Sequence, residues 1–586
     1  MLVKMNYRGP DDLNVHQHGS TTIGNCRLSI VDIAHGRQPL TSACSNWVIT
    51  FNGEIYNFRE LYACLNDRHT FKSQSDTELI MHLFEELGTD CLSRLNGMFA
   101  ICLTNGETTY LIRDRFGVKP IYYRFEKNCL IFASEVKAIL PPQRELNIEM
   151  TYAQFENNIG HETLFKGIFE VPPGSYLKFD SGSRQVAIHT YYSLAQSQTQ
   201  NISENQAVEK MRWLVKDAVR IRTDTDLPYG CFVSGGLDST IVTCLSTPQL
   251  LLSAVVPDRA YLDEQKYILE LEKYKEQKVS QVQLIPSQFP RYFAEMVYSL
   301  DFPTTTLAAY VQFVLSKIVR ENGLRIMLNG LGADEYLGGY MRHVALMFAG
   351  QAVLQKDEYH HYAHLFAKLP ASTTNQHPHE MYYKLISRSH NNTPAGQAII
   401  RRLFNEQTTL MNSLAAVDLA ISFPPLLRTD DRLNMYFGIE TRSPFLDYRI
   451  VEFAFTLVDS LKIRQDHHEN AITKYILRQA FADRLPHKIT NRVDKIGFPS
   501  PVALWLNLYF KYAVKRAYTI LEDISPIRIL FPPRLLSESN EFSRKQWQLL
   551  QWAAWYLLFF EQLSIDEVTN ILFSLESPWR GRQRNT

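Results

Sequence analysis

Short apolar runs separated by polar turns fill the first third of the chain. Residues 47–51 form one such run, and Asn52-Gly53 behind it predicts a turn. Residues 99–103 and 109–112 form two more runs, which flank Asn105-Gly106. Two apolar runs joined by such a short polar segment predict a hairpin. This part of the chain is therefore expected to be rich in antiparallel strands.

The spacing of apolar residues becomes helical further along. Residues 77–87 carry apolar side chains at helical intervals, which predicts a helix within a first domain over residues 1–193. Residues 196–205 are rich in Gln, Ser and Asn and are interpreted as a linker. A second helical pattern over residues 206–220 follows. We expect a new domain to begin there.

Strand and helix patterns alternate in the second domain, which is predicted over residues 206–575. Residues 251–256 and 324–328 are short apolar runs typical of buried strands. Alternation of this kind predicts a parallel, doubly wound sheet with ligands at the carboxyl ends of its strands. From about residue 341 the chain is predicted to be mostly helical, with 547–555 as a last amphipathic helix.

Composition narrows the class of protein. The chain has 586 residues, of which 45% are apolar and 12% aromatic, enough for more than one packed core. Lys and Arg total 61, equal to Asp and Glu, so no nucleic-acid or membrane partner is expected. The eight cysteines form no CxxC pair, which indicates neither a zinc site nor a disulfide framework. No signal-peptide core begins the chain, and the apolar tract 552–560 is too short to span a bilayer, so we expect a cytoplasmic protein.

The run Ser234-Gly235-Gly236-Leu237-Asp238-Ser239 follows a short apolar strand and precedes an apolar stretch. Glycines let the backbone approach a ligand, and N–H groups at a helix start bind anions. The serine hydroxyls can donate to phosphate, and Asp238 can hold Mg²⁺. The alternative is a plain surface turn. The hexapeptide resembles the signature of the pyrophosphate-loop ATPases, which cleave ATP between its α- and β-phosphates.

Six phrases of the first domain, in order, resemble the glutaminase domain of class II glutamine amidotransferases as found in asparagine synthetase. They are RGPDD (8–12), RLSIVD (27–32), FNGEIYN (51–57), SDTE (75–78), LNGMFA (95–100) and RDRFGVKP (113–120). The resemblance implies an Ntn-hydrolase-like αββα sandwich. It implies that Arg27 binds the glutamine carboxylate, Asp76 its ammonium, and Asn52 and Gly53 an oxyanion, with Glu54 also in the glutamine site. The alternative is a hairpin turn beside a surface arginine.

The family's nucleophile is a cysteine at the extreme N-terminus, whose freed amine also serves as the base. Residue 2 here is Leu2, and the first cysteine, Cys26, comes after RGPDD. The strand and helix that the family carries before RGPDD are absent from the sequence as written. We expect either a late reading frame or a domain that has lost its glutaminase activity. As written, this domain is expected not to hydrolyse glutamine.

The resemblance continues through the second domain. The segment 329–340, NGLGADEYLGGY, resembles the second ATP-site segment of asparagine synthetase, and 473–478 carries the lysine expected at the phosphates. Residues 430–435 and 439–447 match the side that binds the acid substrate, and 492–499 closes the pattern. The implied ATP site comprises Val233, Ser234, Gly235, Gly236, Asp238, Ser239, Val255, Asn329 and Gly330, with Asp238 and Asp334 holding Mg²⁺ and Lys474 and Asp334 catalytic.

Leu331 stands where asparagine synthetases carry a glutamate, and Asp301-Phe302-Pro303 where Asp-Glu-Pro is common. The resemblance implies an ATP-dependent ligase that makes asparagine through an aspartyl-adenylate, with nitrogen from glutamine or ammonia. Two alternatives stay open: an amide ligase or cyclase of secondary metabolism acting on another carboxylate, and a catalytically silent regulatory homologue. The expected cofactors are ATP and Mg²⁺. The expected partners are small molecules, with a possible homodimer.

Overall fold

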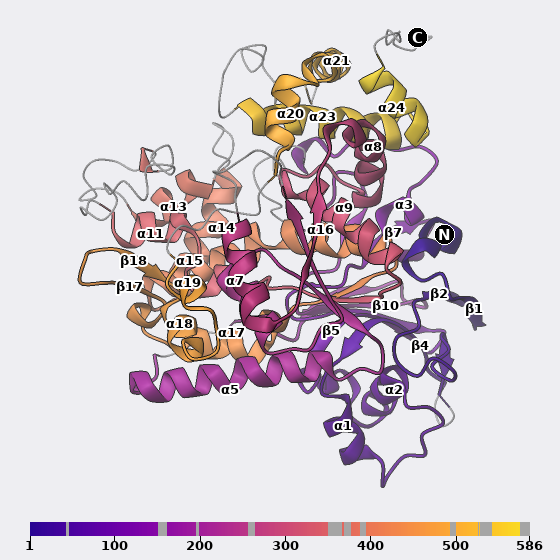
Figure 1. Ribbon diagram of the computed structural model, residues 1–586. Helices are drawn as coiled ribbons and strands as arrows, with labels where there is room; N and C mark the ends of the chain where they lie inside the picture. The colour runs from indigo at the N-terminus through magenta and orange to yellow at the C-terminus, as the bar shows by residue number, and fades with distance from the viewer. Residues whose placement is uncertain are drawn as a thin grey trace.

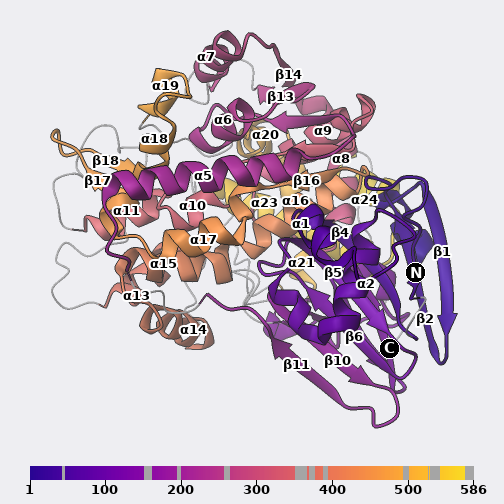
Figure 2. The same ribbon diagram turned by 90° about the horizontal axis from the view of Figure 1, so that it is seen from below.

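The structure is a computed structural model. It describes residues 1–42, 46–150, 161–194, 199–255, 264–349, 366–367, 377–386, 394–492, 500–524, 527 and 542–574. The N-terminal domain lies to one side of a larger, helix-rich domain in both views (Figures 1 and 2). The long helix α5 (Glu204–Thr223) begins the larger domain. Ser203 caps it together with Gln206, so the helix starts inside the stretch predicted as a linker.

The first domain is built on an antiparallel sheet of six strands in the order β11-β10-β6-β5-β4-β3. These strands are β3 (Leu40–Thr41), β4 (Val48–Ile55), β5 (Gly97–Thr104), β6 (Thr108–Arg113), β10 (Ser175–Asp180) and β11 (Val186–Thr190). The predicted hairpin of β5 and β6 is confirmed. On one face the sheet packs against α1 (Phe58–Leu65) and α2 (Asp76–Leu87). The helix predicted over residues 77–87 is therefore confirmed.

The opposite face of this sheet packs against a second β-layer. That layer contains the sheet of β7 (Tyr122–Glu126), β8 (Cys129–Ala133) and β9 (Phe169–Glu170) and the hairpin of β1 (Asp12–His18) and β2 (Thr21–Arg27). Alternate residues such as Ala100 and Cys102 of β5 meet Tyr123 of β7 in a buried core. Two packed sheets with helices outside confirm the predicted sandwich class.

The turn predicted at Asn52-Gly53 is wrong, because β4 runs through both residues to Ile55. Gly53 pairs with Phe99 of β5, and its φ is +150°. A Cβ at Gly53 would overlap the carbonyl oxygen of Met98. Glycine is needed at position 53 because β4 and β5 approach each other closely there. The local sequence Asn-Gly is the same for such a strand position as for a turn, so the sequence pattern could not distinguish the two.

The second domain is built on a fully parallel sheet in the order β14-β13-β12-β15-β16. Its strands are β12 (Tyr229–Phe232), β13 (Leu250–Val255), β14 (Val279–Gln283), β15 (Ile326–Leu328) and β16 (Glu440–Arg442). β12 is the first of these strands in the sequence and lies at the centre of the sheet, so the later strands are added on both sides of it. Phe232 and Met327 face one buried core, and Cys231 and Ile326 face another. This confirms the predicted doubly wound class.

Helices cover both faces of this sheet. The helices of this domain, some of which pack on other helices rather than on the sheet, include α6 (Leu237–Cys244), α7 (Gln265–Lys275), α8 (Phe289–Leu300), α9 (Ala308–Glu321), α10 (Ala333–Tyr336), α11 (Met341–Met347), α13 (Pro378–Ile386), α14 (Pro394–Asn405), α15 (Leu410–Val417), α16 (Pro424–Met435), α17 (Tyr448–Phe455), α18 (Tyr475–Phe481), α19 (His487–Thr490), α20 (Val502–Leu508) and α21 (Lys511–Glu522). A small hairpin, β17 (Ile463–Gln465) with β18 (Ala471–Thr473), lies beside α18.

The helix predicted over residues 547–555 is present as part of α23 (Phe542–Phe559), but it is neither amphipathic nor last. Trp547, Gln551 and Trp555 are all fully buried, and α24 (Ile565–Phe573) follows. Neighbouring helices pack around α23, so it buries side chains on several sides rather than along one apolar stripe.

Paired buried charges join the two domains. Arg8 contacts Glu135 at 3.0 Å and Asp431 of α16 at 2.9 Å. Asp301 accepts a hydrogen bond from Val136 N at 2.8 Å and pairs with Lys137 at 2.8 Å. The departure at Asp301-Phe302-Pro303 therefore lies at the domain interface. Breaking such buried pairs costs about 3–5 kcal/mol, so they fix how the domains meet.

Among the described residues, no single helix is both long and apolar enough to cross a membrane. One bent pair, Leu410–Ser422 with Pro424–Met435, meets the criteria of length and composition alone.

Two candidate active sites

A cavity of about 670 Å³ lies in the first domain and brings together all five residues predicted to bind glutamine. Arg27 ends β2, and Asn52, Gly53 and Glu54 belong to β4. Asp76 is the first residue of α2. The wall also includes Cys26 and, from the second domain, Met435 and Glu440. The cavity therefore reaches the domain interface.

The turn after β2 wraps around Arg27. Its guanidinium donates hydrogen bonds to the carbonyl oxygens of Val31 at 3.0 Å, Asp32 at 2.8 Å and Ile33 at 3.2 Å. These contacts fix the plane of the guanidinium at the cavity wall. A fixed, planar cation is suited to recognising a carboxylate.

Asn52 offers a hydrogen-bond donor to the cavity. Its side-chain Nδ2 is buried, and no hydrogen bond to it is found in the part of the chain that the structure describes. A buried donor without a partner costs about 1–3 kcal/mol, and a bound oxygen atom would recover that energy. The arrangement is compatible with an oxyanion-binding role.

Two carboxyls of the cavity have strongly shifted acidity. Burial raises the pKa of Asp76 to about 7, with a further contribution from Glu440. Burial also raises the pKa of Glu54 to about 8, although Arg442 of β16 lies 3.1 Å away and opposes the shift. Glu440 and Arg442 were not assigned individual roles from the sequence, yet they link this cavity to the sheet of the second domain.

The loop Ser234–Ser239 follows β12 and opens α6 at the carboxyl edge of the parallel sheet. Gly235 has a φ of +67°, which favours glycine. The hydroxyls of Ser234 and Ser239 lie 3.1 Å apart. The loop has the strand–turn–helix geometry that the phosphate-binding prediction requires.

Lys474 joins this loop to the predicted second ATP segment. Its ammonium contacts Asp238 Oδ2 and lies 2.6 Å from Asp334 Oδ1. Burial lowers the pKa of Lys474, but Asp238 and Asp334 outweigh this and hold it above its usual value. A Cβ at Gly339 would overlap both Asp334 Oδ1 and Lys474 Cε, so only glycine permits this junction.

The donor set fits Mg²⁺. Asp238 and Asp334 converge on one point from two separate segments, and each presents hard carboxylate oxygen. The ion would share these carboxylates with Lys474.

The remaining predicted ATP residues surround the loop. Val233 follows β12 and donates its N–H to the Leu252 carbonyl at 2.9 Å, while Val255 ends β13. Asn329 follows β15, and a Cβ at Gly330 would lie 2.7 Å from Ser239 N. The structure therefore brings together all the residues predicted for this site at one sheet edge.

Arg492 stabilises the loop Ser234–Ser239 through the loop backbone. It donates to the Gly235 carbonyl at 3.1 Å and pairs with Glu264. Glu264 received no role from the sequence, because nothing in the local pattern connects it with Gly235. Lys495, Gly497, Phe498 and Pro499 lie outside the described residues.

Leu331 lies in an apolar cluster with Phe116 and Val118 of the first domain and Leu427 and Leu446 of the second. It offers no group that accepts a proton. The carboxylate that the structure places next to this segment is Asp430 of α16, whose oxygens lie 3.3 Å from Asn329 Nδ2.

Asp430 is partly buried among polar groups. It accepts hydrogen bonds from Thr441 Oγ1 at 2.5 Å and Asn434 Nδ2 at 3.2 Å. Burial raises its pKa to about 6, to which Asp431 adds, whereas Thr441 and Lys119 oppose the shift. The sequence matched 430–435 to the acid-substrate side without singling out Asp430. The sequence feature that could have identified Asp430 is the pair of neighbouring carboxylates Asp430-Asp431. Asp431 forms the interface ion pair with Arg8.

A β-sandwich with a cavity of buried polar groups, joined to a parallel sheet with a Ser- and Gly-rich loop at its carboxyl edge, defines a class of two-domain α/β proteins. The comparisons with known proteins agree. Residues 1–192 match the family model for the glutamine amidotransferase domain, and residues 210–557 match the model for asparagine synthase. The chain belongs to the asparagine synthase family, and it is an ATP-dependent carbon–nitrogen ligase.

The relatives include asparagine synthetase [glutamine-hydrolyzing] 1 of Bacillus subtilis (strain 168), 27% identical over 617 residues, covering 96% of this chain and 93% of the relative. Asparagine synthetase [glutamine-hydrolyzing] 3 of the same organism is 29% identical over 84% of this chain and 82% of its own length. Asparagine synthetase B [glutamine-hydrolyzing] of Escherichia coli (strain K12) is 29% identical over 58% of this chain and 60% of its own length.

Proposed function

We propose that the enzyme makes asparagine from aspartate through an aspartyl-adenylate, with nitrogen from glutamine or free ammonia. The observation that carries this proposal is the convergence of Lys474, Asp238 and Asp334 beside the loop Ser234–Ser239. The names of the relatives support aspartate as the acid.

In the first step the carboxylate of aspartate attacks the α-phosphate of ATP, and pyrophosphate leaves. The loop N–H groups and the hydroxyls of Ser234 and Ser239 would bind the phosphates. Bound Mg²⁺, held by Asp238 and Asp334, would neutralise phosphate charge. Lys474 would stabilise the negative charge on the pyrophosphate leaving group.

In the second step an amine attacks the acyl carbon and AMP leaves. The attacking nitrogen must lose a proton, and Leu331 cannot accept one. We assign this proton to the carboxylate of Asp430, which is hydrogen-bonded to Asn329 at the end of β15. A pKa of about 6 leaves Asp430 ionised at neutral pH and suited to take up a proton.

The cavity of the first domain would bind glutamine. Arg27 and Asp76 would bind the two charged ends of glutamine's amino-acid group, and Asn52 and Gly53 an oxyanion. Met435 and Glu440 of the second domain line the same cavity. Ammonia present in this cavity would therefore enter the second domain at this wall, close to Thr441 and Asp430.

A second candidate is an amide ligase that acts on another carboxylate and an amine of its own substrate. The apolar cluster around Leu331 favours it, because a larger, apolar substrate would pack there and ammonia would not. Both candidates share the adenylation step and differ in acid and amine.

The experiment that tests the first candidate measures pyrophosphate release from ATP and Mg²⁺ with aspartate, supplying ammonia or glutamine, with products identified by mass spectrometry. Asparagine is expected, and Lys474→Met should abolish the aspartate-dependent pyrophosphate. Absence of aspartate-dependent pyrophosphate from the unaltered enzyme would remove aspartate as the acid. Pyrophosphate release with another carboxylate would then support the second candidate.

A further inference from the structure

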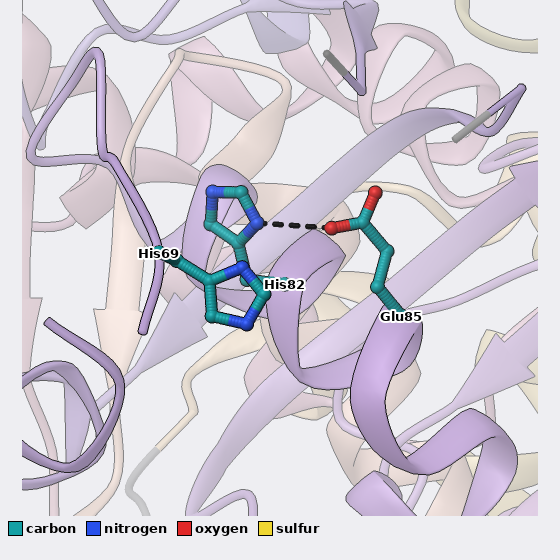
Figure 3. Close-up of side chains that lie close together, drawn as sticks. All are labelled: His69, His82 and Glu85. Carbon is teal, nitrogen blue, oxygen red and sulfur yellow. Dashed lines mark hydrogen bonds and ion pairs between the residues drawn. The ribbon is translucent and has the colours of Figure 1, made fainter. Parts of the chain in front are cut away.

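A cluster of imidazoles and carboxylates lies on α2, apart from both candidate active sites. One nitrogen of His69, one nitrogen of His82 and one oxygen of Glu85 lie within 4.8 Å of one another. Figure 3 shows the two rings facing each other, with Glu85 beside His82. His82 and Glu85 are one helical turn apart on α2, and His69 comes from the loop after α1. The ring centroids are 4.4 Å apart.

The surrounding carboxylates determine where the ring protons lie. His69 Nε2 lies 2.8 Å from Glu86 Oε1, so this nitrogen carries the proton and leaves Nδ1 with a lone pair. His82 Nε2 faces Glu78 Oε1 at 3.7 Å, and no hydrogen bond reaches this nitrogen among the described residues. A carboxylate behind each imidazole is the arrangement that orients metal-binding histidines.

His82 Nδ1 lies 3.0 Å from Glu85 Oε2. If Nε2 holds the proton, Nδ1 and the carboxylate are two acceptors in contact, which is unfavourable unless a cation lies between them. His82 is only 6% exposed, so water does not relieve this conflict. Arg68 pairs with Glu86 at 2.8 Å, whereas the ion pairs found for Glu78 and Glu85 among the described residues are with His82.

We propose that His69, His82 and Glu85 bind a zinc-class divalent transition-metal ion that fastens the loop of residues 66–75 to α2. Two imidazoles and one carboxylate match the donors that zinc prefers, and they lack the many oxygens that Mg²⁺ and Ca²⁺ require. Ligands of tetrahedral zinc lie about 3.4 Å apart, given bonds of about 2.0–2.1 Å. His82 Nδ1 and Glu85 Oε2 lie 3.0 Å apart, so moving these atoms apart by a few tenths of an ångström would reach this spacing, and rotation of the His69 ring, which is only partly buried, would bring in the third ligand.

The site would act through the loop that it fastens. Gln74 in this loop donates its N–H to Asp32 at 2.9 Å, and Asp32 belongs to the turn that holds Arg27. The loop ends at Ser75, directly before Asp76. An ion at His69 would therefore stabilise the segment between the two residues proposed to bind glutamine.

The test uses the full-length protein treated with a chelator and then titrated with Zn²⁺ or Co²⁺. We expect one equivalent to bind, a Co²⁺ ligand-field spectrum, and a higher melting temperature with Zn²⁺ than with Mg²⁺ or Ca²⁺. His69→Gln and Glu85→Gln should each weaken binding by at least about tenfold. Both side chains are partly exposed, so the variants should fold.

The matched control is His16→Gln, which removes another histidine of the same domain on β1. It should leave Zn²⁺ affinity unchanged. Equal Zn²⁺ affinity in the unaltered protein, His69→Gln and Glu85→Gln would overturn the proposal. So would the absence of a Zn²⁺-dependent rise in melting temperature.

Discussion

The two candidate active sites are constructed differently. The site in the first domain is an open cavity of about 670 Å³ whose buried carboxyls, Asp76 and Glu54, have raised pKa values of about 7 and 8. The site in the second domain is closed by contacts among its own functional groups, with Lys474 between Asp238 and Asp334. A preformed cavity needs only to be filled, whereas the proposed ATP site would have to exchange its internal ion pairs for contacts with the nucleotide and a metal ion.

This difference predicts how each site responds to substitution. Changes in the second site should alter its assembly and therefore its reaction rate. Changes in the cavity should alter mainly the affinity for glutamine. The predictions below test this contrast.

The largest effect is expected from Gly339→Ala. The added methyl group would overlap Asp334 and Lys474, so the two could no longer meet. We expect ATP–pyrophosphate exchange to fall by about 10³-fold or more, as when a preorganised charge is lost. Glutamine binding to the first domain should persist. Gly182→Ala is the control, because its Cβ would meet no atom closer than 3.6 Å. Normal exchange in Gly339→Ala would show that the junction is not required.

Asp430→Asn should separate the two steps. Adenylation, measured as ATP–pyrophosphate exchange, should continue. Amide formation should fall by about 100-fold because the proton acceptor is lost. The base must be ionised, so the amide-forming rate of the unaltered enzyme should rise with pH through about 6. The Asn variant should lose this rise. Lys119 and Asp431 also face this group. A rise retained in the variant would show that Asp430 is not the group that titrates.

The control for this prediction is Asp226→Asn, a change of carboxylate to amide at an exposed position. It should leave both steps unchanged. Equal losses of exchange and amide formation in Asp430→Asn would indicate that Asp430 only supports the fold around Asn329 and Thr441.

Asp76→Asn should weaken glutamine binding by about tenfold or more, because a charge-assisted contact to the ammonium is worth about 1.5–3 kcal/mol. Calorimetric titration with glutamine measures this directly. Pyrophosphate release with ammonia as the nitrogen source should change little. An unchanged glutamine affinity would contradict the proposed role of Asp76.

Local sequence patterns predicted those elements that are determined by residues close together in the sequence. Helical spacing identified α2, and the hexapeptide Ser234–Ser239 identified the turn between β12 and α6. The pattern could not identify β16, because Glu440, Thr441 and Arg442 are all polar. They are buried as a strand because Arg442 pairs with Glu440 at 2.9 Å and with Glu54 of the other domain. That compensation depends on contacts distant in sequence.

The same limit applies to the sites. Motif resemblance named Asp238, Asp334 and Lys474, and the fold brings these residues together. Asp430 lies beside Asn329 although 101 positions separate them, and no spacing rule indicates such a contact. Residues that act through tertiary proximity could be identified only from the structure.

The smallest effect is expected from Ser75→Ala. Ser75 caps α2 by accepting a hydrogen bond from Glu78 N at 3.3 Å, and its loss should cost about 1 kcal/mol. That cost corresponds to a melting temperature lower by about 2 °C, measured by scanning calorimetry. Because α2 begins with Asp76, the cap also holds this carboxylate at the cavity wall.

Ser203→Ala is the matched control for Ser75→Ala, since Ser203 caps α5 in the second domain in the same way. Both variants should lose similar stability, but only Ser75→Ala should weaken glutamine binding. Equal glutamine affinities in the two variants would mean that the cavity tolerates fraying of α2. In that case the loop of residues 66–75, rather than the helix cap, would fix the position of Asp76.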